Sequence, residues 1–189
     1  MESYICVTCG TQMPVTEGPP ESCPICEDDR QYTGWNGQQW TTLTRLQASH
    51  KNIIEEDEPG RIGITTEPTF AIGQRARLIR TPGGNVLSEC ISLLDEPTAQ
   101  AVKALGGLSA IALSHPHFCS SMIEWSRAFG STPIYIHADN RPWIVRPEPE
   151  VVFWEGDQHA LGNGLTLVRC GGHFPGSTVL HWEGGANGQ

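Results

Sequence analysis

The sequence has no apolar run long enough to cross a bilayer and no excess of basic residues. A membrane-spanning helix needs about 20 consecutive apolar residues, and no segment approaches that length. Lys and Arg number 12 against 21 Asp and Glu, which gives a formal net charge of −9. A nucleic-acid partner would call for a basic face. We therefore expect neither a membrane nor a nucleic acid as a partner.

Targeting and nucleotide-binding motifs are also missing. The first residues, Met-Glu-Ser-Tyr, have neither the basic nor the apolar stretch of a secretory signal. The chain contains no P-loop, no dinucleotide fingerprint, no internal repeat and no low-complexity tract. Its seven cysteines, without a secretory signal, fit a reducing compartment. The sequence therefore predicts a cytoplasmic protein.

What the sequence does have is a pair of CxxC motifs near its start, Cys6-Val-Thr-Cys9 and Cys23-Pro-Ile-Cys26. Each CxxC forms a knuckle in which two thiolates reach one ion, and this spacing is used by zinc ribbons and rubredoxin-like sites. Two disulfides are the alternative, which the missing secretory signal disfavours. We expect Cys6, Cys9, Cys23 and Cys26 to bind one metal ion and to define a module over residues 1–34. Zinc is the expected ion, with iron as the alternative.

The rest of the chain predicts a linker and an α/β domain. Apolar residues at three- and four-residue steps over 41–57, followed by Pro59-Gly60, predict a helix within a linker at 35–60. From residue 61 to 189, short apolar runs bounded by Gly and Pro alternate with two short helices, one from Pro97 to Leu105 and one that starts at Ser121 with a capping box. The predicted strands are 69–72, 76–80, 84–88, 108–114, 133–137, 151–154, 165–169 and 178–182.

A second group of metal-ligating residues follows two of these predicted strands. His115 and His117 flank Pro116, which favours extended backbone before it, so their side chains should point the same way. His173 follows Gly171-Gly172 just after a further strand. Active groups of α/β sheets gather at the carboxyl ends of strands. Two histidines there plus a third in a Gly-rich loop predict a three-nitrogen zinc site with an open fourth position.

These motifs resemble the metallo-β-lactamase fold superfamily over roughly residues 61–182. Its members carry an HxHxDH motif and a later G-H-x-P-G-S segment, which Ser114-His115-Pro116-His117 and Gly172–Ser177 match in part. The run Glu155–Val168 is similar to the hairpin that precedes the second segment. The resemblance implies a layered αββα domain with zinc, sometimes iron, held by His115, His117 and His173. Tyr4 and the second knuckle resemble rubredoxin, a small iron protein.

Two departures from the family pattern bear on the site. Cys119 and Ser120 stand where the family has Asp and His, so Cys119 is either a soft replacement ligand or a buried thiol. The family's bridging aspartate and last histidine lie in a second, β-rich half that follows the G-H-x-P-G-S strand, and this chain matches only the first half of such a domain. The expected fold class is therefore α/β (α+β), a metallo-β-lactamase-like domain in mainly its first half, preceded by the four-cysteine module. We expect a homo-oligomer or a partner to cover the incomplete domain.

Three functions follow as hypotheses. The first is a metal-dependent hydrolase in which a metal-activated water attacks a small-molecule ester, thioester, amide or phosphodiester, with His137 at the end of a neighbouring strand as a candidate proton shuttle or fourth ligand. The second is a metal-binding pseudoenzyme, favoured by the replaced Asp-His pair. The third is electron transfer by iron in the four cysteines.

Overall fold

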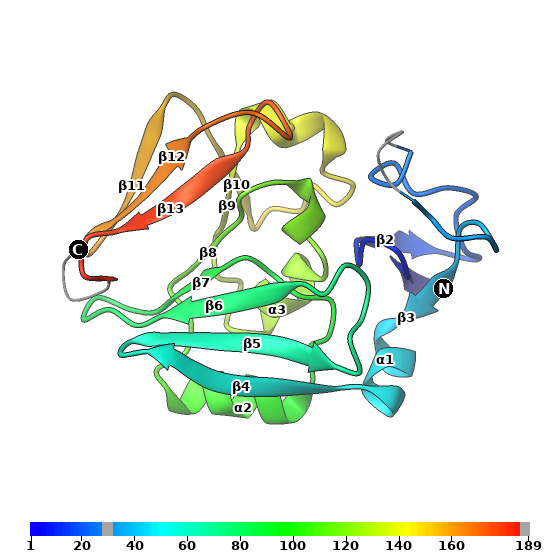
Figure 1. Cartoon of the computed structure of the whole chain (residues 1–189), viewed down its shortest axis with the longest axis horizontal. Helices are drawn as coiled ribbons and strands as arrows, with labels where there is room; N and C mark the ends of the chain where they lie inside the picture. Colours follow the sequence, from blue (N-terminus) through cyan, green and yellow to red (C-terminus); the bar gives the residue numbers. More distant parts are fainter. Residues whose placement is uncertain (28–31, 186–189) are drawn as a thin grey trace.

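The computed structural model describes residues 1–27 and 32–185 and arranges them in three sheets (Figure 1). The strand orders are β2-β1-β3, β10-β9-β8-β7-β6-β5-β4 and β11-β12-β13. The strands are β1 (Glu2–Cys6), β2 (Gln12–Thr16), β3 (Trp40–Thr42), β4 (Lys51–Glu58), β5 (Arg61–Glu67), β6 (Arg75–Ile79), β7 (Val86–Ser88), β8 (Ala110–Ala112), β9 (Ile134–His137), β10 (Val151–Trp154), β11 (Gln158–Gly162), β12 (Leu165–Arg169) and β13 (Thr178–Trp182). The helices are α1 (Leu43–Ser49), α2 (Glu96–Ala104) and α3 (Met122–Ala128), with 3₁₀ turns η1 (Pro116–Phe118) and η2 (Ala138–Trp143).

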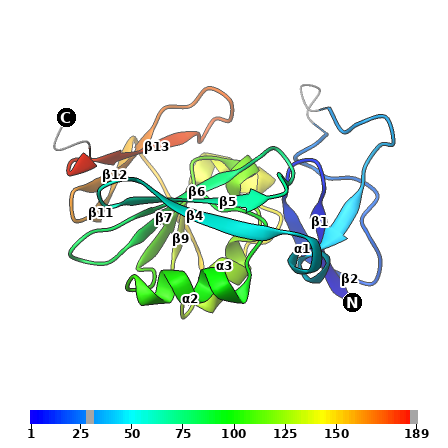
Figure 2. The ribbon, with the colours of Figure 1, turned by 60° about the horizontal axis from the view of Figure 1, so that its bottom comes forward.

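The seven-stranded sheet is the central layer of the larger domain (Figure 2). On one face, α2 and α3 contribute Val102, Ile123 and the fully buried Trp125 to the main core. On the other face, Leu165 and Leu167 of β12 pack against Trp154 and small residues of β8. The described residues therefore supply three of the four layers expected of an αββα domain.

The strands on one side of this sheet run in the same direction, and their carboxyl ends form a common edge. β7, β8, β9 and β10 pair in parallel, whereas β4, β5 and β6 pair antiparallel. Backbone turns follow each parallel strand at that edge, and one of them carries His115 and His117. The predicted gathering of polar groups at the strand ends is confirmed for these two histidines.

The N-terminal module has a small core of its own. The four knuckle cysteines, Met13 and Ile25 are buried together, and Trp143 and Val145 of the larger domain pack against them. The module extends past the predicted boundary at residue 34, because β3 pairs antiparallel with β1.

The helix predicted over residues 41–57 is wrong over most of its length. Helix α1 ends at Ser49, and the following residues form β4, the edge strand that pairs with β5. Ile53 and Ile54 fitted a helical spacing, but β-branched side chains are well suited to a pleated sheet. Pro59-Gly60, interpreted as a helix stop, is the hairpin turn between the two strands, with φ +82° at Gly60.

The strand predicted at 69–72 is also wrong, since a turn occupies it, with Ala71 at φ +50° and Gly73 N–H donating to the Phe70 carbonyl. The strands predicted at 151–154, 165–169 and 178–182 are confirmed. Both short helices are present, but Ser121 makes no side-chain cap and instead donates its hydroxyl to the Ser92 carbonyl. In the described part of the chain, no helix combines the length and apolar character that a bilayer span requires.

Replacing Gly10 should disturb the contact between the module and the larger domain. Gly10 has φ +81°, and a Cβ there would overlap the Ser92 hydroxyl and lie 2.7 Å from Gln74 Oε1. Gly34 has φ +91° with open space around its Cβ position. We expect Gly34→Ala to cost about 1–2 kcal/mol of unfolding free energy from backbone strain alone, and Gly10→Ala to cost about 1–3 kcal/mol more through overpacking. Urea unfolding of the two variants tests this, and equal losses would contradict the close approach.

Candidate metal centres

The four knuckle cysteines lie together in the module core. Their Sγ atoms are all within 4.8 Å of one another, with Cys6–Cys26 and Cys9–Cys23 each 3.6 Å apart. A tetrahedral site with metal–sulfur bonds of ~2.3 Å separates its sulfurs by roughly 3.8 Å. All seven cysteines are free, so neither knuckle forms a disulfide. The geometry of this cluster fits a single tetrahedral ion.

Hydrogen bonds to sulfur favour thiolates at the first knuckle. The Cys9 backbone N–H lies 3.5 Å from Cys6 Sγ, and Gln38 Nε2 donates to the same sulfur at 3.2 Å. Hydrogen bonds from Cys23, and then from Cys26, lower the pKa of Cys6 and the pKa of Cys9. Within the same cluster, the neighbouring thiols raise the pKa of Cys23 and the pKa of Cys26, and all four sulfurs must lose their protons when they bind a cation.

The three predicted histidines also converge. One ring nitrogen of each lies within 4.8 Å of the other two, and His173 Nε2 is 3.0 Å from His117 Nδ1. Two nitrogens bound tetrahedrally at ~2.0–2.1 Å from a zinc ion would be roughly 3.3 Å apart. The ring centroids are 5.0–5.5 Å apart. The donor set and its spacing fit one divalent ion with an open position.

The turn after β8 orients the first two histidines, but not for the predicted reason. His115 is extended, with φ −165° and ψ 171°, as a residue before proline should be. Pro116 to Phe118 then form the 3₁₀ turn η1, so His117 does not continue the extended strand. The two rings converge because this tight turn brings them together, rather than because side chains alternate along a strand.

Backbone pairing brings the third histidine to the same place. At the start of β13, Thr178 N–H donates to the Ser114 carbonyl at 3.0 Å, which joins the His173 loop to the turn after β8. Gly171 and Gly172 adopt φ +67° and +95°, which allows the loop to reverse before His173. Phe174 is buried beneath the site, with its ring centroid 4.7–5.8 Å from those of all three histidines.

The environment keeps His115 neutral at ordinary pH. Burial, followed by the like charges of His117 and His173, lowers the pKa of His115 to about 4. The Ser114 hydroxyl lies 2.7 Å from His115 Nδ1, which leaves Nε2 as the ring atom available to a ligand. A neutral imidazole oriented by a hydrogen bond through its other nitrogen is the usual form of a metal-binding histidine.

Two further candidates from the sequence lie outside this cluster. His137 is buried, and both its ring nitrogens are engaged, because Nε2 lies 3.0 Å from the Gly156 carbonyl and Nδ1 accepts the Asp139 N–H at 3.1 Å. Cys119 packs in the main core, and burial, followed by the charges of Glu89 and Cys9, raises its pKa. Neither residue belongs to the group of three histidines whose ligand atoms come together.

Two polar residues near the site were missed by sequence reasoning. Glu89 follows β7 and accepts the Ser114 backbone N–H at 3.2 Å, and it lines a pocket of about 360 Å³. Its place directly after a predicted strand was a usable signal, since such residues lie at the carboxyl edge. Gln74 precedes β6, and its side-chain amide donates to the backbone carbonyls of Cys9 and His117. No sequence motif predicts this role.

Comparison with known proteins identifies one close relative in sequence and several in structure. The chain is 49% identical over 191 residues to the uncharacterized protein YmaE of Bacillus subtilis (strain 168), an alignment that covers all of this chain and 69% of YmaE. No protein-family model matches the sequence.

The similar solved structures are metallo-β-lactamase fold proteins. The DIM-1 metallo-β-lactamase superposes with a TM-score of 0.55 at 14% identity, covering 69% of this chain. TMB-1 gives 0.55 at 16% identity over 68% of this chain. TTHA1623 in a di-iron-bound form gives 0.51 at 22% identity, covering 63% of this chain and 65% of its own. The chain spans 64% of DIM-1 and of TMB-1. The expected layered metallo-β-lactamase-like fold is thus confirmed, while identities this low establish the fold alone.

Glu89 should make the folded protein less stable as pH rises. Burial raises its pKa from 4.5 to about 7, so the folded protein retains a proton that the unfolded chain has already released between these values. Stability falls with pH wherever the folded state binds more protons. Relative to Glu89→Gln, the wild type should lose about 1–3 kcal/mol of unfolding free energy between pH 4.5 and pH 8. Urea unfolding at both pH values, in the same metal-loading state, measures this difference. The control is Glu55→Gln at an exposed site on β4, and an equal pH response in both variants would contradict the burial argument.

Proposed function

The chain belongs to the family of the Bacillus subtilis protein YmaE. We propose that it is a metal-dependent hydrolase that holds one ion between His115, His117 and His173. The convergence of these three imidazoles at the carboxyl edge of the parallel strands is the observation that carries the proposal. The metallo-β-lactamase fold supports it, since that fold presents a site at the same edge. The small-molecule substrate is an ester, thioester, amide or phosphodiester.

The residues around the site favour hydrolytic chemistry. A bound divalent ion lowers the pKa of its water toward ~7 and polarises a carbonyl or phosphoryl oxygen. The lowered pKa of His115 keeps its ring neutral and able to ligate above about pH 4. Phe174 packs under the three rings and excludes water from that side, while the exposed position of His173 leaves the other side open to substrate.

A second ion is a structural one in the module. The four sulfurs would hold zinc, because their buried, tetrahedral-like arrangement is that of a closed structural site with no open position. Iron in the same cluster would make the module an electron-transfer unit like rubredoxin. The colour of the purified protein distinguishes the two, since a ferric tetrathiolate is red and a zinc site is colourless.

A metal-binding pseudoenzyme is the second candidate function. The observation that favours it is the position of the Cys119 side chain, which packs in the main core and is not among the ligand atoms that converge with the histidines. The segment that carries a second-ion ligand in the resembling family therefore supplies none here. Histidine-dependent turnover of generic esters, thioesters or phosphodiesters would eliminate this candidate.

Metal content measures the number of centres directly. Elemental analysis of the purified protein should give two metal ions per chain, and replacing His115, His117 and His173 together by Ala should leave one. The same triple substitution should reduce hydrolysis to the uncatalysed rate. His181→Ala, an exposed histidine on β13 outside the cluster, is the control and should retain both ions. If the triple variant retained two ions per chain, the three-histidine site would be disproved.

Removing the Cys119 thiol should not empty the histidine site. Cys119→Ala deletes a buried sulfur that lies outside the cluster, so we expect about 1 kcal/mol of lost stability, as for a typical point substitution, and unchanged metal content. Elemental analysis together with thermal unfolding checks both quantities. Loss of one ion per chain in this variant would instead make Cys119 a ligand.

A further inference from the structure

A single buried side chain joins the backbones of the two candidate metal centres. Gln74 lies just before β6 and is 7% exposed. Its Nε2 donates to the Cys9 carbonyl at 2.9 Å and to the His117 carbonyl at 2.6 Å. Cys9 belongs to the four-cysteine cluster and His117 to the three-histidine cluster. One amide group thus contacts a residue of each centre.

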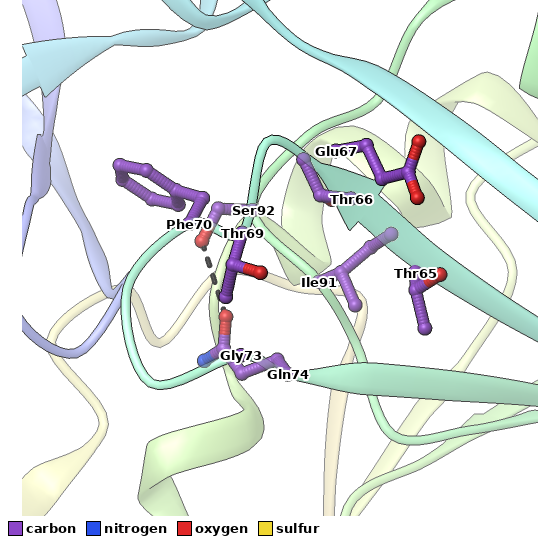
Figure 3. Close-up of a pocket in the computed structure, with 9 residues that line it drawn as sticks. All are labelled: Thr65, Thr66, Glu67, Thr69, Phe70, Gly73, Gln74, Ile91 and Ser92. Carbon is purple, nitrogen blue, oxygen red and sulfur yellow. Dashed lines mark hydrogen bonds between the residues drawn. The ribbon is translucent and has the colours of Figure 1, made fainter.

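The chemistry of these groups determines how the amide is oriented. Both partners are carbonyl oxygens, which only accept hydrogen bonds, so the NH₂ end of Gln74 must face them, and its two hydrogens satisfy one carbonyl each. The other end, Oε1, faces the Ser92 hydroxyl at 3.4 Å. Figure 3 shows Gln74 and Ser92 in the wall of a pocket of about 190 Å³ beside the module. Removing the amide would leave two buried carbonyls without this donor, which destabilises the arrangement.

The surrounding contacts hold the two backbone segments in one arrangement. Ser92 Oγ donates to the Gly10 carbonyl at 2.8 Å, and Gln12 N–H donates to the Ser120 carbonyl at 3.2 Å. Buried Arg146 reaches Gln12 in the module and bonds the Glu124 carboxylate of α3 at 2.9 Å. The segment after Cys9 is therefore packed along the segment after His117.

We propose that Gln74 is a positioning residue that couples metal binding at the two centres, so that an ion in the four-cysteine site raises the metal affinity of the three-histidine site. The ion fixes the backbone at Cys9, which holds Gln74 in place, and Gln74 fixes the carbonyl of His117 and with it the position of the imidazole. Without the ion, the backbone at Cys9 is no longer fixed, because small thiolate modules owe their folding to the metal. By linkage, an ion at the histidines raises the affinity of the cysteine site by the same factor. The inference rests on the proposed function only in requiring that the three histidines bind an ion.

A double-mutant cycle tests the coupling. One arm disrupts the second knuckle with Cys23→Ser and Cys26→Ser, which do not alter Cys9, and the other arm is Gln74→Leu. Cobalt(II) is titrated into two kinds of protein, one whose cysteine site holds zinc and one whose cysteine site is disrupted. The visible absorption of the bound cobalt reports occupancy of the histidine site. With Gln74 present, disruption of the knuckle should lower the affinity of the histidine site for cobalt about tenfold, which is the size of effect expected when a group that supports a metal ligand is lost. In Gln74→Leu, the same disruption should lower that affinity little further.

A matched control separates coupling from general loss of stability. Asn85 is a second buried amide whose Nδ2 donates to two backbone carbonyls, those of Leu105 and Gly107, each at 2.9 Å, but it contacts neither centre. Asn85→Leu should leave the tenfold effect of knuckle disruption intact. Loss of the effect in Asn85→Leu as well would overturn the specific role of Gln74.

The reciprocal measurement keeps the test valid if the cysteine variants do not fold. His173→Ala vacates the histidine site through an exposed residue that does not contact Gln74, and it should weaken zinc binding at the cysteine site by the same factor in competition with a chelator. Equal cobalt or zinc affinities in all backgrounds would overturn the coupling and leave the proposed function standing. Absence of any histidine-dependent cobalt signal in the unaltered protein would overturn both.

Discussion

The candidate site depends on one backbone contact between segments that lie far apart in the chain, the hydrogen bond from Thr178 N–H to the Ser114 carbonyl. Ser114 follows β8 of the central sheet, and Thr178 begins β13 of the small sheet. The contact joins the two sheets at the carboxyl edge of the parallel strands and brings His173 to the other two histidines. Apolar packing of β12 against β8 and β10 supports this contact from below. The small sheet is thus the element that completes the group of three imidazoles.

Sequence reasoning predicted which cysteines and which histidines come together, but not the structure that holds them. Cysteine spacing and the position of His115, His117 and His173 after apolar runs were sufficient, because ligand types are few and their spacing is constrained by the ion. The convergence of the rings is confirmed. The reason predicted for it, side chains alternating along an extended segment, was wrong for His117, because that residue lies in the 3₁₀ turn η1. Gln74 could not have been predicted, because it acts on backbone carbonyls that no side-chain pattern reveals. Glu89 could have been, from its place directly after a strand.

Both errors in secondary structure arise from tertiary contacts that the local apolar pattern does not reveal. Over residues 41–57 the apolar positions fit both a helix and the strand β4, and tertiary pairing with β5 decided between them. The run at 69–72 is apolar because Phe70 packs on the small core formed by Ile5, Leu46 and Leu93, not because it forms a strand. Three strands with clear apolar character and flanking turn residues, β10, β12 and β13, were predicted at their observed bounds. Local pattern was reliable where burial and turn chemistry agreed, and unreliable where a partner strand supplied the deciding interaction.

The N-terminal module is packed against the larger domain rather than standing apart from it. Its core is small, with Met13 and Ile25 beside the four cysteines, and small thiolate modules of this kind owe their folding to a bound metal. Trp143 of the larger domain contacts both regions. It packs against the module core, and its ring meets Phe174 edge-on beneath the histidines, with ring centroids 5.1 Å apart. The amide of Gln74 and the aromatic pair are thus two separate sets of contacts between the module and the histidine site. Because the amide acts on the backbone that carries His117, whereas the aromatic pair packs beneath the rings, the amide is expected to dominate, and the small effect of knuckle disruption that remains in Gln74→Leu would measure the contribution of Trp143 and Phe174.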